Sequence, residues 1–127
     1  REVHIYDGDV ASYADFVAKV NARQDGSWAV QTSKHEIESY LHSDAINEAF
    51  NVMVEVTDHP VDGKSTPKCF AEAYSTAQNF DGVMKDAPAK LRLAESAFPL
   101  MTAARIHERD PDGELVGWMR KIRDMIQ

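Results

Sequence analysis

Two short apolar segments near the start of the chain flank a stretch with helical periodicity, and this order constrains the fold more than any other feature. Glu2–Tyr6 and Trp28–Gln31 are rich in β-forming residues and short enough to be strands. Between them, apolar side chains of residues 12–23 recur with helical spacing, and Ser12 can cap the helix. A strand, a helix and a strand within about 30 residues form a βαβ unit, whose strands are parallel. The sequence therefore predicts an α/β fold with a right-handed crossover.

A pair of carboxylates comes after each predicted strand. Asp7 and Asp9 come directly after the first strand and flank Gly8, whose conformational freedom suits a tight loop. Glu36 and Glu38 come after the second strand at the same spacing. Because ligands gather at the carboxyl ends of parallel strands, we expect these side chains to share one acidic pocket. Carboxylate oxygens are ligands of hard divalent cations, so Mg²⁺ or Mn²⁺ is the expected occupant.

The two pairs are not equivalent. Ser33 and Glu36 have the spacing of a helical capping box, which predicts a helix from Ser33 onwards. In a regular helix Glu36 and Glu38 would point about 200° apart and only one could bind the cation, whereas in an irregular first turn both could. We expect Glu38 to be a ligand and Glu36 to be either a ligand or a cap. Taken separately, each pair also fits a simpler interpretation, a turn for the aspartates and solvated helix charges for the glutamates.

Lys90 is the candidate cationic residue. It lies on a predicted helix, and a lysine beside a metal pocket can neutralise charge that develops on a phosphate. An ordinary exposed lysine is the alternative. The five histidines show no metal-ligand spacing among them. His35 could touch a substrate because it is next to Glu36, although an exposed helix histidine is the simpler interpretation.

The rest of the chain is predicted to be mainly helical. Alternation of valines favours a strand over Asn51–Val56, and Thr57–Lys68 has the prolines and glycine of a loop. We therefore predict a βαβ segment in residues 1–56 and, in the same domain, a helical extension in residues 57–127. Helices are expected at Asp44–Phe50, Lys68–Asn79, Ala87–Ala97, Leu100–Glu108 and Glu114–Ile126.

Composition limits the surface charge, the cellular compartment and the membrane association that we expect, but it does not identify a function. A formal net charge of −7 argues against a generic basic surface for nucleic acid, but bound cations can reverse the local field at an acidic pocket. The single cysteine, Cys69, cannot close an internal disulfide, which favours a reducing cytoplasm. No apolar run approaches the roughly 18 residues of a membrane-spanning helix, and no signal peptide is evident, so no membrane partner is expected.

The segments Val3–Asp9 and Ser33–Leu41 together resemble the second half of a TOPRIM domain, in the version carried by OLD-family (overcoming lysogenization defect) ATPase-nucleases of anti-phage defence. In that family a strand ends in Asp-x-Asp, and a segment such as Arg-Glu-Ile-Glu-Asn-Tyr-Leu comes after the next strand. Here His35 stands where arginine is common, and Ser39 where asparagine is common. Lys90 resembles the family's downstream catalytic lysine. The closing segment Glu114–Ile126 is similar to the family's last helix.

The resemblance implies Mg²⁺- or Mn²⁺-dependent cleavage of a nucleic acid backbone, with DNA favoured over RNA. It implies catalytic roles for Asp7, Asp9, Glu38 and Lys90, and metal binding by the four carboxylates. It also implies an ATPase domain or subunit and a homo-oligomer in the full-length context. A further glutamate would come from a strand that precedes Arg1, so we expect this chain to be a portion of the enzyme that is incomplete for catalysis alone.

Two other functions compete with this interpretation. One is a catalytically inactive assembly or sensing module that keeps the same fold. The other is a haloacid-dehalogenase-like phosphatase, with Asp7 as nucleophile and Asp9 as acid and base. That class favours Thr or Val where Ala11 stands, and it needs a later strand with a further acidic pair. Asp81 and Asp86 come after no clear strand.

Overall fold

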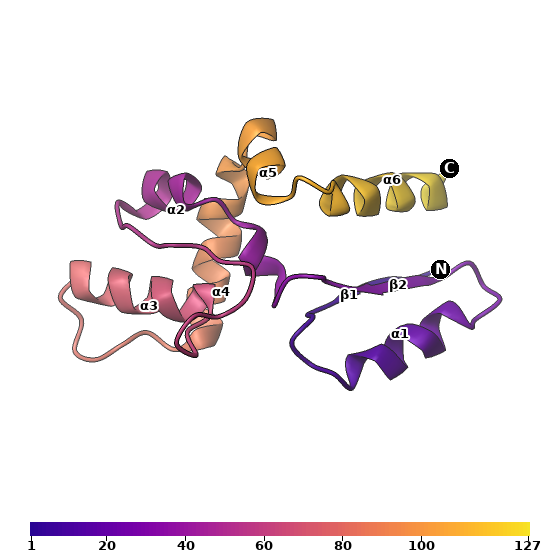
Figure 1. Ribbon diagram of the computed structural model, residues 1–127, viewed down its shortest axis with the longest axis horizontal. Helices are drawn as coiled ribbons and strands as arrows, with labels where there is room; N and C mark the ends of the chain where they lie inside the picture. Colours follow the sequence, from indigo (N-terminus) through magenta and orange to yellow (C-terminus); the bar gives the residue numbers. More distant parts are fainter. The chain divides into compact units, whose positions relative to one another are not determined.

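The computed structural model describes residues 1–127 and shows a mixed α/β protein with one two-stranded parallel sheet and six α-helices (Figure 1). The chain divides into two compact units. Residues 1–37 and 112–127 form the first unit, and residues 38–111 form the second. The expected division at residue 56 stays a prediction.

The first unit contains the predicted βαβ arrangement. Its strands are β1 (Val3–Tyr6) and β2 (Trp28–Gln31), and the helix α1 (Tyr13–Asn21) connects them. The strands are parallel and in register over their whole length, which confirms the prediction. The helix α6 (Glu114–Ile126) completes the unit, and α1 and α6 lie on opposite sides of the strands (Figure 1). Both faces of a parallel sheet are usually covered in this way.

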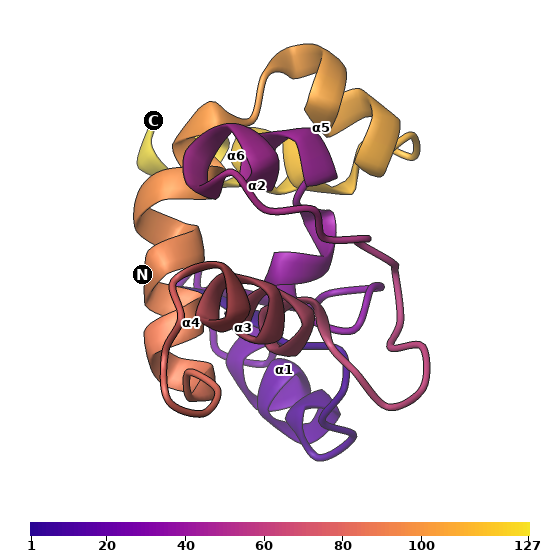
Figure 2. The ribbon, with the colours of Figure 1, turned by 90° about the vertical axis from the view of Figure 1, so that its left-hand side faces the viewer.

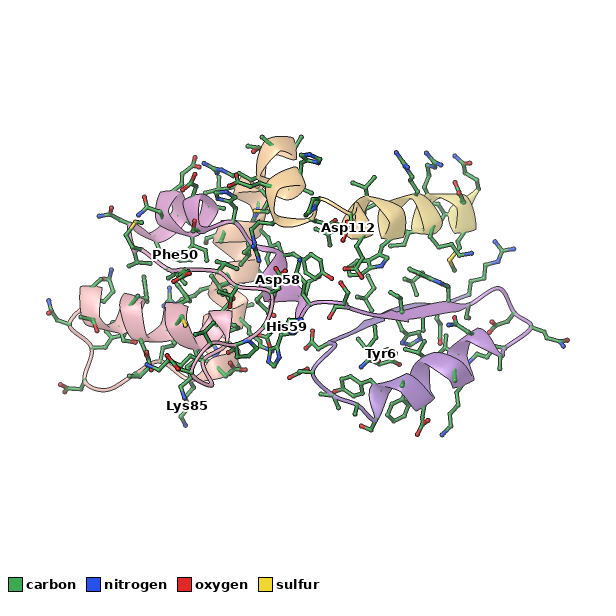
Figure 3. The ribbon with its side chains drawn as sticks, viewed as in Figure 1. Tyr6, Phe50, Asp58, His59, Lys85 and Asp112 are labelled. Atoms are coloured by element: carbon green, nitrogen blue, oxygen red, sulfur yellow. The ribbon has the colours of Figure 1, made fainter.

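An aromatic cluster holds α1 against the sheet. The ring of Tyr6 lies 5.1 Å from that of Tyr13 and 6.2 Å from that of Phe16, measured between centroids. Figure 3 labels Tyr6 between the strands and α1. Tyr13 and Phe16 are one helical turn apart, so both can reach the same strand residue. Ring pairs at these separations are favourable beyond the apolar area that they bury.

The two outer edges of the sheet differ. At the outer edge of β2, the side chain of Asn21 donates to the carbonyl of Ala29 and accepts from its N–H, at 2.9 and 2.8 Å. This amide takes the place of a third strand there. On β1, the main chains of Val3 and Ile5 point away from β2, because the alternate residues bond to it. The edge of β1 is therefore the open one.

The second unit is helical. Figure 2 shows α3 and α4 lying side by side, with α2 beside the helical continuation of α4. That continuation begins as one turn of π-helix. Most of the predicted helices are confirmed, with bounds within a few residues of those predicted. The elements are the 3₁₀ turn η1 (Ile37–Tyr40), which starts in the first unit, and α2 (Ser43–Phe50), α3 (Thr66–Ala77), α4 (Asp86–Arg92), η2 (Leu93–Ala97), η3 (Phe98–Leu100) and α5 (Ala103–Arg109).

The core of this unit forms where α2, α3 and η2 meet. Leu41, Ile46, Phe70 and Leu93 are completely buried there. The ring of Phe50, labelled in Figure 3, lies 4.7 Å from that of Phe70. Burying a side chain of this size contributes about 1.5–3 kcal/mol. The second unit therefore has a hydrophobic core of its own.

Two local predictions are wrong. No helix begins at Ser33, because its hydroxyl and its N–H both donate to the carboxylate of Glu114, at 2.7 and 3.2 Å, and the chain bends as far as Glu36. No strand forms at Asn51–Val56, although its burial alternates as in a strand. The segment pairs with no other part of the chain.

Candidate metal centre

The loops after β1 and β2 are joined by hydrogen bonds. The N–H of Thr32 donates to the carbonyl of Tyr6 at 2.9 Å and extends the ladder by one step. Beyond it, the N–H of Gly8 donates to Oγ1 of Thr32 at 2.8 Å, and the N–H of Asp9 donates to the carbonyl of His35 at 3.0 Å. The carboxyl ends of the two strands therefore form one connected edge, as the sequence predicts.

Gly8 permits this close approach. A Cβ atom at this position would lie 2.3 Å from the carbonyl oxygen of Thr32 and 2.5 Å from that of Lys34. Both atoms belong to the main chain, so a side chain could be accommodated only by moving a loop. The hydroxyl of Thr32 also donates to the carbonyl of Lys34 at 2.7 Å, which holds that carbonyl in place. The glycine between the two aspartates is thus needed for contact with the second loop.

Three side chains at this edge form a cluster with metal-ligand chemistry, which we call the Asp-His-Glu cluster: Asp9, His35 and Glu36. One ligand atom from each lies within 4.8 Å of the others. Nε2 of His35 is 3.5 Å from Oδ2 of Asp9 and 4.0 Å from Oε2 of Glu36. The three residues range from exposed Asp9 through half-buried His35 to buried Glu36. The cluster is therefore reachable from solvent on the Asp9 side and enclosed on the Glu36 side.

Asp7 holds the second loop in place. Its Oδ1 accepts a hydrogen bond from the N–H of Ile37 at 3.2 Å, directly after Glu36 in the chain. The side-chain amide of Gln31 donates to the carbonyls of Asp7 and Val10, at 3.2 and 2.8 Å. These contacts fix both ends of the Asp7–Asp9 loop relative to β2. Asp7 remains a predicted ligand, and the bond to Ile37 gives it a positioning role as well.

The other two predicted site residues belong to the second unit. Glu38 is buried in η1. Lys90 lies near the end of α4, where its ammonium group is 3.8 Å from the carboxylate of Asp86. Their predicted catalytic roles stay predictions. Within the first unit, the structure brings Asp9 together with Glu36, the glutamate whose role the sequence left open.

His35 is not the exposed helix histidine that the sequence favours. The structure shows it half-buried in a bent, non-helical segment, with its ring nitrogen facing two carboxylates. One sequence feature could have indicated a role for His35, namely that it is adjacent to Glu36. A histidine adjacent to a candidate ligand lies in the same loop as that ligand. The predicted helix obscures that signal, since adjacent residues on a helix diverge by about 100°.

The donor set suits a divalent cation. Two ligand atoms bound at about 2.1 Å to one cation can be at most about 4.2 Å apart, so the separations in the cluster need only small side-chain movements. Two carboxylates bring two negative charges together, and a cation offsets their repulsion. An imidazole nitrogen is a donor that first-row transition ions accept more readily than Mg²⁺. Between the two predicted ions, the cluster therefore fits Mn²⁺ better than Mg²⁺.

Comparison of the chain with protein-family models, with curated proteins and with solved structures gave no match. The helices offer no candidate for a membrane span, because none combines the necessary length with the necessary hydrophobicity.

Proposed function

We propose that the loops after β1 and β2 bind a divalent cation, preferentially Mn²⁺, and that the chain is the metal-binding portion of a phosphodiester-cleaving nuclease. The convergence of Asp9, His35 and Glu36 at the carboxyl edge of two parallel strands carries this proposal. In a parallel sheet this edge is where functional groups gather.

Each residue of the edge has a distinct task in the proposed site. Asp9 and Glu36 contribute carboxylate oxygens from two separate loops, and His35 contributes its Nε2 atom. Asp7 orients the second loop through Ile37 and adds negative charge beside the cluster. A cation held in this way can generate a hydroxide nucleophile from water and stabilise the leaving oxygen of a phosphodiester. The exposed Asp9 side gives a substrate its access.

The nuclease assignment itself rests on the resemblance of Val3–Asp9 and Ser33–Leu41 to the TOPRIM domains of OLD-family proteins. Under this proposal Glu38 and Lys90 act in catalysis, DNA is the favoured substrate, and an ATPase domain or subunit is the partner. A further glutamate from an additional strand would complete the site. Mn²⁺ binding depends on the chain's own cluster and can be tested separately from cleavage.

Titration of the 127-residue chain with Mn²⁺, monitored by electron paramagnetic resonance of the free ion, tests the metal site. We expect Asp9→Asn and Glu36→Gln each to weaken binding by at least about tenfold, because even outer-shell partners of metal ligands contribute this much. Asp15→Asn is the matched control, since Asp15 is an exposed carboxylate of α1 outside the cluster. Equal affinity of the wild type, Asp9→Asn and Asp15→Asn chains would show that the cluster does not bind the ion.

Cleavage is tested on supercoiled plasmid DNA with the longest natural polypeptide that contains this sequence, because the resemblance implies a glutamate from another strand. We expect nicking in Mn²⁺ that Asp9→Asn abolishes and Asp15→Asn leaves unchanged. A polypeptide that binds Mn²⁺ through the cluster but leaves the plasmid intact would contradict the nuclease assignment and would leave the metal site standing.

A further inference from the structure

The segment Asn51–Val56 in the second unit has the side-chain arrangement of a strand without the pairing of one. Val52 and Val54 are 6% and 5% exposed, whereas Met53 between them is 80% exposed and Glu55 is also exposed. This alternation is typical of extended backbone that packs on one face. The buried valines belong to the core of the unit, so the segment is held firmly in place.

The main chain of this segment has hydrogen-bonding capacity that the fold does not use. The side chain of Asn47 donates to the carbonyl of Val52 at 3.3 Å. For residues 53–56 we find no main-chain hydrogen bond. Main-chain donors and acceptors are nearly always paired when they are removed from water. A held, extended and unpaired segment is therefore a template for one more strand.

Two hollows meet at this segment. One has a volume of about 390 Å³, the other of about 310 Å³, and Glu55 lines both. Figure 1 shows the segment running between α2 and α3, and the lining residues come from both sides. The first hollow is lined by Ser43, Met53, Val54, Glu55 and Val56. The second is lined by Glu55, Thr57, Val61, Asp62, Lys64 and Cys69.

The charge of this surface is negative. Glu55 and Asp62 take part in no ion pair. The one cation of the lining, Lys64, is neutralised by Glu72, whose carboxylate lies 2.9 Å from its ammonium group. A strand docked on this surface would therefore place one of its residues opposite Glu55. Lys or Arg suits that position best, since opposite charges across a strand pair are favourable.

We propose that Met53–Val56 is a docking strand for an extended segment of another protein that alternates apolar and basic residues. The main chain of the partner would bond to that of residues 53–56, its basic residues would face Glu55 and Asp62, and its apolar residues would enter the hollow beside Val54. This is recognition by strand addition, in which main-chain bonds supply affinity and side-chain pockets supply specificity. A second copy of the same segment fits poorly, because Glu55 would repeat the negative charge on both strands.

The test uses the uniformly ¹⁵N-labelled chain and an acetylated, amidated peptide of alternating valine and lysine, about six residues long to match a typical strand. We expect the amide resonances of residues 53–56 to shift and their hydrogen exchange to slow as the peptide is added. Glu55→Lys should weaken binding about fivefold to tenfold, as like charges replace opposite ones. Glu95→Lys is the control, because Glu95 is an exposed glutamate of the same unit that lines neither hollow.

Reversing the charge on both the chain and the peptide distinguishes docking at Glu55 from general attraction of a basic peptide to an acidic chain. A peptide of alternating valine and glutamate should bind Glu55→Lys more tightly than it binds the wild type. Binding that shifts resonances elsewhere and leaves residues 53–56 unchanged would overturn the proposal. Equal affinities of the Glu55→Lys and Glu95→Lys variants would overturn it too, and so would a peptide-free dimer that pairs through residues 53–56. Each variant must keep the amide spectrum of the folded chain outside the site of its substitution.

Discussion

Two extended segments, β1 and Asn51–Val56, have similar sequence patterns but differ in strand pairing. Both alternate in burial, yet β1 pairs along its whole length with β2, whereas Asn51–Val56 pairs with nothing. The difference lies in the path of the chain beyond each segment. After β1, a helix of the right length returns the chain so that β2 can lie beside it, while after Val56 the chain enters an irregular loop. Alternation thus specifies an extended backbone, and a partner must be supplied by the path of the chain.

The same comparison extends to the loops at the ends of these segments. The loop after β1 is fixed by hydrogen bonds to the loop after β2, and this brings Asp9 to His35 and Glu36. The loop after Val56 contains a tight turn in which the N–H of Lys64 donates to the carbonyl of Val61 at 3.1 Å, but this turn joins no second strand. Pairing therefore determines where a site can be assembled from two distant parts of the sequence.

The largest expected effect comes from breaking the contact between the paired loops. Gly8→Ala should lower the free energy of unfolding by about 3 kcal/mol, because its Cβ would overlap two main-chain carbonyl oxygens. Mn²⁺ affinity should fall with it. Gly117→Ala in α6 is the control and should stabilise the chain by up to about 1 kcal/mol, since a Cβ there meets no atom and glycine disfavours helix. Urea denaturation measures both. Equal stability of the Gly8→Ala variant and the wild type would show that the loops do not approach this closely.

Hydrogen exchange compares pairing directly at two residues of equal burial. Thr32 and Val54 are 4% and 5% exposed, but only the N–H of Thr32 has a main-chain partner, the carbonyl of Tyr6. We expect the amide of Thr32 to exchange at least about a hundredfold more slowly than that of Val54, because exchange depends on the opening of hydrogen-bonded structure. Similar protection at both residues would mean that Asn51–Val56 has a partner in solution.

Two asparagines, one at the outer edge of β2 and one beside Asn51–Val56, offer a smaller test of the comparison. Asn21→Ala removes both bonds to the main chain of Ala29, which is buried, and should destabilise the chain by about 2 kcal/mol. Asn47→Ala removes the bonds that this side chain donates to the carbonyl of Val52 and to Sδ of Met53, at 3.3 and 3.2 Å. The loss should cost about 0.5–1 kcal/mol, because the sulfur is a weak acceptor. Thermal and urea unfolding of the two variants give the difference. A larger loss for Asn47→Ala than for Asn21→Ala would show that the two bonds of Asn21 do not secure the outer edge of β2.

The smallest effect concerns Cys69, which lines the hollow beside Glu55. Burial raises the pKa of its thiol above the ordinary value, and the charge of Glu72 raises it further. A raised pKa leaves less thiolate at a given pH, so iodoacetamide at mildly alkaline pH should alkylate Cys69 several times more slowly in the folded chain than in urea. The rate should rise with pH through a midpoint above that of the unfolded chain. Mass spectrometry measures the rates, and equal rates would contradict the described environment of this thiol.

Residues with strong local signals were predicted well. β2 and α6 have the predicted bounds, and the parallel pairing agrees with the spacing of strand, helix and strand. The strand predicted at Asn51–Val56 did not form because no second strand lies beside it, and the helix predicted from Ser33 did not form because a side chain had a choice of partner. Ser33 has the spacing of a cap for Glu36, but it bonds to Glu114, which lies far along the chain. No local pattern could have revealed this competition, because the two partners meet only after α6 packs in the first unit.

The sequence by itself determined most of the helical and extended segments, and it placed carboxylates at the ends of two parallel strands, because periodicity and chain-crossover geometry are local properties. Only the tertiary structure decided which side chains meet. It joined His35 and Glu36 to Asp9, since an irregular turn replaced the predicted helix, and it left Asn51–Val56 without a strand beside it. Pairing and clustering depend on contacts between residues distant in sequence, and such contacts exist only once the chain has folded.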